Sequence, residues 1–156
     1  MRHRTLGFIL GGLLLCLGLP QAHSVVGITI AGTAWSATVN SSNTSTSAGW
    51  PTLTSGVSQQ TLSTTGSGSS ARTISVKRTD STWNASFTLN VQRTGNGTGV
   101  VPVGGTSYIA IGTTNVAFFT FSGNNITNVP IQYQLTGMTG TVVANTYLTT
   151  ITFTVA

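Results

Sequence analysis

Serine and threonine hydroxyls are the most numerous reactive groups in this chain, but the residues that would activate them are scarce. A serine nucleophile needs a base, usually histidine, and a carboxylate that orients the base. The chain has two histidines, His3 and His23, in a segment that we predict to be removed on export, and one acidic residue, Asp80. Lys77 is an unusual alternative base, but in Lys77-Arg78, next to Asp80, it is typical of an exposed strand end. We therefore expect a protein that is not an enzyme.

A single carboxylate also argues against most metal and cofactor sites. Glycoside hydrolysis needs two carboxyl groups in most families, and zinc needs three or four Cys, His or carboxylate ligands. A calcium site built on Asp80 with backbone and asparagine carbonyls would be weak. No glycine-rich phosphate loop precedes a helix. The sequence predicts no cofactor and no bound metal.

Aromatic side chains offer the one binding chemistry that the sequence supports. Sugars stack on exposed tryptophan and tyrosine rings, while Asn, Gln and Thr side chains hydrogen-bond to sugar hydroxyls. Trp35 and Trp83 alternate with apolar neighbours and are expected in a core. Trp50 stands before Pro51 in a polar stretch, and it is the candidate glycan contact.

Residues 1–24 have the pattern of a secretory signal peptide. Arg2 and Arg4 precede an apolar run from Leu6 to Leu19, and Ala22-His23-Ser24 is a small-x-small cleavage site. A transmembrane anchor is the alternative, but the run is shorter than the ~20 apolar residues that span a bilayer. We predict a secreted protein, extracellular or on the cell surface, with the periplasm as another location and no membrane span after cleavage.

The predicted mature chain has few charges and no cysteine, because Cys16 leaves with the signal. Its bases are Arg72, Lys77, Arg78 and Arg93. Four basic residues are few for a nucleic-acid-binding surface, so we predict no nucleic-acid partner. We interpret these residues as lying on solvated strand faces. Without disulfides, stability must come from core packing and sheet hydrogen bonds.

Alternation of apolar and polar residues predicts β-strands throughout the mature chain. The clearest are Trp83 to Val91, Tyr147 to Val155, and Val129 to Leu135, with Pro130 at the start or edge. Val116 to Phe121 is apolar on both faces and is expected to be a central strand. Shorter candidates are Val26 to Ile30, Thr33 to Val39, Ile74 with Val76, and Tyr108 to Ile111.

Glycine- and asparagine-rich turns separate these strands, as in Gly95-Asn96-Gly97. Seven to eight short strands with this spacing favour an all-β fold, an immunoglobulin-like antiparallel β-sandwich. Residues 25–156 are predicted to form this single domain. The Ser/Thr/Gly-rich stretches 40–49 and 63–71 are predicted to be loops within it.

The C-terminal third carries a family resemblance. Ile131-Gln132-Tyr133-Gln134-Leu135, a glycine turn, and the run Asn145 to Val155 with its Thr-hydrophobic alternation resemble the end of spore coat protein U type domains, which are pilin-like. The resemblance implies an immunoglobulin-like fold and a role in surface coats or fimbria-like fibres. Some relatives assemble by lending an N-terminal strand to the next subunit.

The chain has an N-terminal segment that could be lent in this way. Val26, Ile28 and Ile30 alternate at the mature N-terminus, and an exposed alternating strand can complete a neighbour's open sheet edge. The favoured alternative is an ordinary first strand paired within its own sheet. The leading hypothesis is a secreted structural protein that associates with itself. The second is a carbohydrate-binding or adhesive module that recognises surface glycans.

Overall fold

The computed structural model describes residues 26–38, 52–139, 142 and 145–156. The predicted signal peptide, the predicted loop 40–49 and Trp50 lie outside the described residues. Within these residues the fold is all-β, as the sequence predicts, with no helix and therefore no helix that could cross a membrane. The strands are β1 (Gly27–Gly32), β2 (Leu53–Thr54), β3 (Gln60–Thr65), β4 (Ala71–Thr82), β5 (Thr88–Arg93), β6 (Thr98–Gly99), β7 (Ile109–Ala110), β8 (Val116–Ser122), β9 (Ile126–Thr127), β10 (Val129–Thr136) and β11 (Leu148–Val155).

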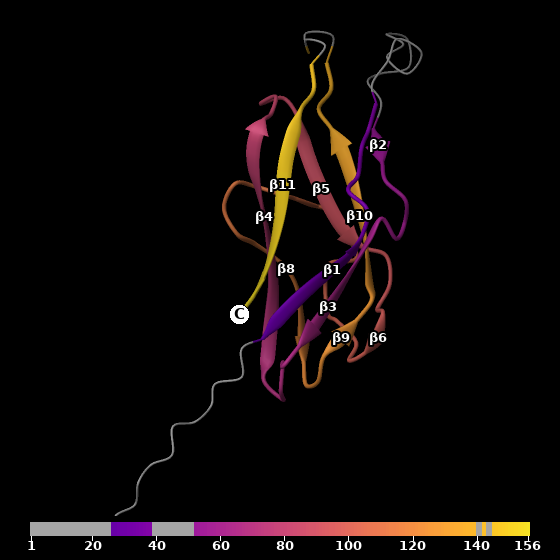
Figure 1. The fold of residues 1–156 in the computed structure, drawn as a ribbon, viewed down its shortest axis with the longest axis vertical. Coiled ribbons are helices and arrows are strands. Elements are labelled where there is room, and N and C mark those ends of the chain that lie inside the picture. Colours follow the sequence, from indigo (N-terminus) through magenta and orange to yellow (C-terminus); the bar gives the residue numbers. More distant parts are fainter. Residues whose placement is uncertain (1–25, 39–51, 140–141, 143–144) are drawn as a thin grey trace, which may run out of the picture.

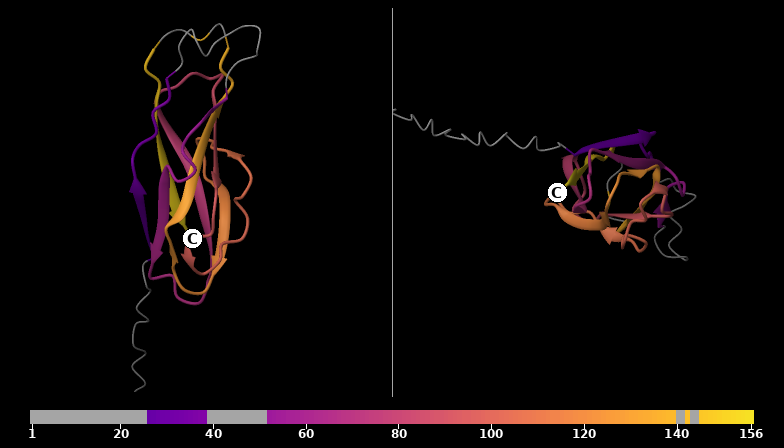
Figure 2. Two further views of the ribbon diagram at one scale, coloured as in Figure 1. Left: turned by 90° about the vertical axis from the view of Figure 1, so that its right-hand side faces the viewer. Right: turned by 90° about the horizontal axis from the view of Figure 1, so that it is seen from below.

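Two larger sheets, antiparallel throughout, build a β-sandwich (Figures 1 and 2). The first has the order β1-β3-β10-β5-β7, with β2 paired to β10 outside this path. The second has the order β11-β4-β8, and a small third sheet joins β6 to β9. Seven of the strands have six residues or more, so the predicted seven to eight strands correspond to the long ones.

The core fills the space between the two larger sheets. Alternate residues of the long strands point inwards, as expected of half-buried strands. The residues with no more than 1% exposure that form its centre are Leu62, Ile74, Val76, Val91, Phe121, Ile126, Val129, Ile131 and Tyr133. The Tyr133 hydroxyl donates a 2.6 Å hydrogen bond to Gln60 Oε1, and burial raises the pKa of Tyr133 above its ordinary value.

The strand predicted from Trp83 begins later than the alternation indicates. β4 continues to Thr82, and β5 starts only at Thr88. Between them Asn84 forms a turn: its backbone carbonyl accepts a 3.0 Å hydrogen bond from Phe87 N. Its side chain accepts one of 2.9 Å from Ser86 N. Asparagine side chains stabilise turns in this way, so local hydrogen bonding overrides the alternation there.

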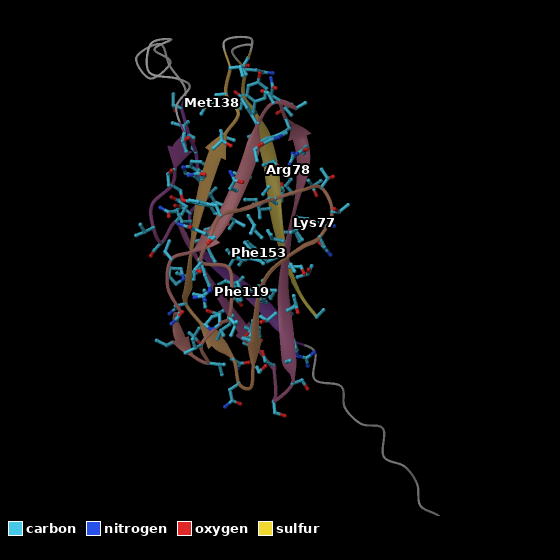
Figure 3. The ribbon with its side chains drawn as sticks, turned by 180° about the vertical axis from the view of Figure 1, so that it is seen from behind. Lys77, Arg78, Phe119, Met138 and Phe153 are labelled. Atoms are coloured by element: carbon cyan, nitrogen blue, oxygen red, sulfur yellow. The ribbon has the colours of Figure 1, made fainter. Side chains whose placement is uncertain are left out.

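The expectation that residues 116–121 form a central strand is wrong in its position. β8 is an edge strand of the three-stranded sheet. Its register to β4 shifts, so that Phe119 pairs with Ile74 and Ala117 with the next residue, Ser75. Phe118 is the extra residue of a β-bulge, and this lets it and Phe119 both be buried. Phe119 and Phe153 are labelled in Figure 3; Phe119 is buried, and Phe153 packs against the core from β11.

Two further predicted boundaries differ from those in the structure. In the predicted loop 63–71, residues 63–65 belong to β3 and Ala71 begins β4, so only residues 66–70 connect the two sheets. Ser67 in this connection is buried, and its hydroxyl donates to Thr64 Oγ1 at 3.1 Å.

The strand expected over 33–39 is not formed by residues 33–38. The chain leaves the ladder after Gly32, whose φ is +110°.

Candidate functional site

The charged residues in the described part of the chain lie on β4 and β5, which have neighbouring strands on both sides, although each charged residue is itself strand-paired on one side only. β4 is the middle strand of its sheet, and β5 lies between β10 and β7. The edge strands β1, β7, β8 and β11 contain no charged residue. The charged residues are Arg72, Lys77, Arg78 and Asp80 on β4, and Arg93 on β5. The outermost strands therefore lack the charges that commonly prevent edge strands from pairing with other chains.

β1 is the edge strand that contains the predicted donor segment. All six of its residues pair with Gln60–Thr65 of β3. Ile28 and Ile30 lie opposite Thr64 and Leu62, which are both buried, so all four side chains face the core. Ile28 packs against the core, but Ile30 is 38% exposed. Half-buried Val26 directly precedes the strand. In the single chain the segment is an ordinary edge strand, and its donation to a neighbour stays a prediction.

β11 is the edge strand of the other sheet on the same side of the sandwich. It pairs with β4 alone, and the ladder continues to Ala156, which exchanges two hydrogen bonds of 2.9 and 3.1 Å with Thr73. Its inward side chains Ile151, Phe153 and Val155 pack against the core but stay half-buried. β1 approaches β11 (Figure 1), yet no backbone hydrogen bond joins these two strands. We call this the β1–β11 seam.

The opposite side of the sandwich is closed by hydrogen bonds. Arg78 N on β4 donates to Gly112 O at 2.8 Å, and Arg78 Nε donates to Ile111 O at 3.0 Å. Further along, Val103 and Thr120 of β8 exchange backbone hydrogen bonds of 2.7 and 2.9 Å. The 100–112 segment thus covers the edges on that side. Among the described residues, the β1–β11 seam has no comparable cover.

Arg93 departs from the prediction of a solvated strand face. It is 6% exposed, and its side chain lies on the inward face of β5, in phase with Leu89 and Val91. Nη2 donates to Pro102 O at 2.9 Å, and Nη1 donates to Gly95 O at 3.2 Å and to Asn96 Oδ1 at 2.6 Å. Nε donates to Gly104 O. The pKa of Arg93 is lowered because burial disfavours its charged form. The alternation of Leu89, Val91 and Arg93 was the sequence signal for this burial.

Asp80, the single acidic residue, forms an ion pair with Arg78. Its Oδ1 also accepts a 2.9 Å hydrogen bond from Thr149 Oγ1 of β11. The Arg78 guanidinium lies 4.9 Å from the ring centre of Trp83, a cation–π distance. Of the neighbouring bases Lys77 and Arg78, Asp80 thus pairs with Arg78. The described residues contain no group of three or more His, Cys, Asp or Glu that could hold a metal.

An open hollow of about 570 Å³ lies beside Arg93, on the β5 side of β10. It is lined by Arg93, by amide and hydroxyl side chains and by Val57, with no aromatic ring. Gln92 Nε2 donates to Gln132 Oε1 at 2.8 Å, and Gln132 Nε2 donates to Ser55 O at 3.0 Å. These amides are therefore largely satisfied within the protein. The predicted glycan contact, Trp50, lies outside the described residues.

Comparison with protein-family models, with curated proteins and with solved structures finds no match for this chain. The resemblance to spore coat protein U type domains therefore stays a prediction from the C-terminal residues. The fold itself adds two observations. The described edge strands carry no charge, and the hydrogen bonds of the described residues close only one of the two sides of the sandwich.

Proposed function

We propose that this chain is a secreted, non-catalytic structural protein that builds a cell-surface coat, matrix or fimbria-like fibre by association with itself. The observation that carries the proposal is the absence of charge from every described edge strand, together with the β1–β11 seam. An uncharged edge exposes a row of unpaired N–H and C=O groups, which is a template for pairing with another chain. A protein that had to remain monomeric would be expected to protect such edges.

The seam also contains apolar surface that the monomer leaves incompletely covered. Ile30 is 38% exposed although it lies on the inward face of β1, and Phe153 on β11 is half-buried. A strand from a second copy that paired with β11 would gain backbone hydrogen bonds and cover Phe153, and a lent β1 would bring its own Ile30 under cover in the neighbour. We propose β1 of a neighbouring copy as that strand, because it alternates and carries no charge.

The division of the long strands supports a more specific fold proposal. Four of them lie in the sheet of β1 and three in the sheet of β11. A seven-stranded immunoglobulin-like domain divides its strands in the same numbers. We include an immunoglobulin-like sandwich in the proposal on this basis.

Deletion of residues 25–31 tests strand donation. If β1 is lent to a neighbour, the shortened chain loses its polymers while its fold persists as a monomer. Size-exclusion chromatography with light scattering measures the first property, and circular dichroism measures the second. A shortened chain that still forms polymers like those of the intact protein contradicts donation. A monomer that unfolds supports the ordinary first strand.

Electron microscopy of native cells, with an antibody against this chain, tests the cellular role. Label along fibres or a surface layer supports the structural function. Label that is confined to the medium as soluble protein contradicts it. In the competing carbohydrate-binding function, glycan-array binding would be lost in Trp50→Ala.

A further inference from the structure

Arg93 is a buried cation without an acidic partner. Its guanidinium is hydrogen-bonded to three backbone carbonyls and to Asn96 Oδ1, all of them neutral. The one acidic residue of the chain, Asp80, is paired with Arg78. A buried charge is costly unless it is both hydrogen-bonded and paired. The position of Asn96 Oδ1, 2.6 Å from Arg93 Nη1, is where a carboxylate oxygen would supply that pairing.

Asn96 is followed by Gly97, and this is the only Asn-Gly pair in the sequence. Asn-Gly is the dipeptide in which an asparagine amide is lost most readily, because glycine has no side chain to hinder attack by its own backbone nitrogen. Asn96 is exposed, so water can reach it. Gly97 has φ +66°, and a Cβ there would lie 2.2 Å from Thr127 O. The turn therefore requires glycine at the position that also favours the reaction.

We propose that Asn96 converts to aspartate in the folded protein, through a cyclic imide with Gly97, and that the new carboxylate becomes the ion-pair partner of Arg93. The Gly97 backbone nitrogen attacks Asn96 Cγ and forms the N–Cγ bond, while its proton passes to water. The negative charge that develops on Oδ1 is stabilised by the Arg93 Nη1 donor. The Cγ–Nδ2 bond then breaks, and ammonia leaves with a proton taken from water.

Water, the only co-reactant, completes the conversion by adding to the imide and opening the ring. Breaking the N–Cγ bond gives aspartate, whereas breaking the bond to the Asn96 backbone carbonyl carbon gives isoaspartate. The net reaction consumes one water and releases one ammonia, and nothing is oxidised or reduced. Isoaspartate would add a methylene to the backbone at a turn where Gly97 already packs closely against residues 127–129. The folded protein should therefore yield mainly aspartate.

Incubation of the folded protein in mildly alkaline buffer, followed by peptide mapping, tests the proposal. Fragmentation that distinguishes aspartate from isoaspartate should find the acid at Asn96 ahead of every other asparagine, mainly as aspartate. The same chain in denaturant should give mainly isoaspartate. Asn96 that remains an amide in the folded protein after the denatured chain has converted would overturn the proposal. So would a product that is mainly isoaspartate in both samples.

Three variants test the role of Arg93. Arg93→Lys should slow the conversion in the folded state by roughly tenfold, since it removes the aligned Nη1 donor. Asn96→Asp, which is the product itself, should raise the melting temperature above that of the original chain. The matched Asn96→Gln, which keeps an amide and extends it, should not. Asn96→Asp that melts no higher than Asn96→Gln would overturn the ion-pair assignment, even if Arg93→Lys fails to fold.

Discussion

Ile30 of β1 lies directly opposite Leu62 of β3 in the antiparallel ladder, yet Leu62 is fully buried and Ile30 is 38% exposed. Paired residues share a face of the sheet, so both side chains point towards the core. The difference in exposure arises because β3 is covered by the opposing sheet, whereas β1 lies at the β1–β11 seam. The seam is thus the place where the monomer leaves inward-facing apolar surface in contact with water.

The two isoleucines of β1 should contribute unequally to monomer stability. Ile28 packs against the core, so Ile28→Ala should lower the free energy of unfolding by about 2 kcal/mol. Ile30→Ala should cost about 1 kcal/mol or less, because less of its surface leaves water on folding. Denaturant unfolding of dilute protein measures both values. An equal or larger cost at Ile30 would show that β1 is packed differently from this description.

Alkaline pH should destabilise the fold through Tyr133. Burial raises the pKa of Tyr133 in the folded state above its unfolded value of about 10. A raised pKa means that the neutral form is preferred on folding. Stability is therefore fully present below the unfolded pKa and is lost as the pH rises above it. Denaturant unfolding at increasing pH should show this decrease.

Tyr133→Phe provides the control for that pH dependence. It should flatten the alkaline decrease, at a cost of about 1 kcal/mol at neutral pH for the lost hydrogen bond to Gln60. An alkaline decrease of unchanged size in Tyr133→Phe would assign the pH dependence to another group.

Two glycines with similar backbone angles should respond differently to alanine. Gly137 has φ +81°, and a Cβ there would lie 1.9 Å from Ser86 O. Gly68 has φ +62° and nothing within 4 Å of such a Cβ. Gly68→Ala should cost only the left-handed strain of about 1 kcal/mol. Gly137→Ala should cost roughly 3 kcal/mol or more, since backbone must also move. Thermal melting that lowers both variants equally would contradict the close packing of Gly137 against Ser86.

Strand positions could be predicted from the sequence where alternation is uninterrupted. Val129, Ile131 and Tyr133 are buried in phase on β10, as their spacing predicts. β4 was predicted only around Ile74 and Val76, because polar and charged residues beyond them hide the rest of its twelve residues.

The remaining differences between the predicted and the observed strands have local causes that the apolar–polar pattern does not reveal. The turn at Asn84 depends on a side-chain hydrogen bond, and the burial of both Phe118 and Phe119 depends on a bulge. Arg93 is buried although it is charged, because its phase on β5 points it inwards and the backbone carbonyls of Pro102 and Gly104 accept its hydrogen bonds. The lack of charge on the edges could not be recognised before the strand order was known.

A single lysine on the outward face of β1 tests the central claim of assembly through uncharged edges. Thr29→Lys places a charge on this edge strand, where Thr29 is exposed. Thr79→Lys is the matched control, because Thr79 is also exposed but lies on β4, where it pairs with Thr150 of β11 and is not part of an outermost strand. Light scattering and electron microscopy of the purified proteins measure assembly. The account predicts that Thr29→Lys stays monomeric while Thr79→Lys assembles like the original chain. Equal assembly of both variants would contradict it.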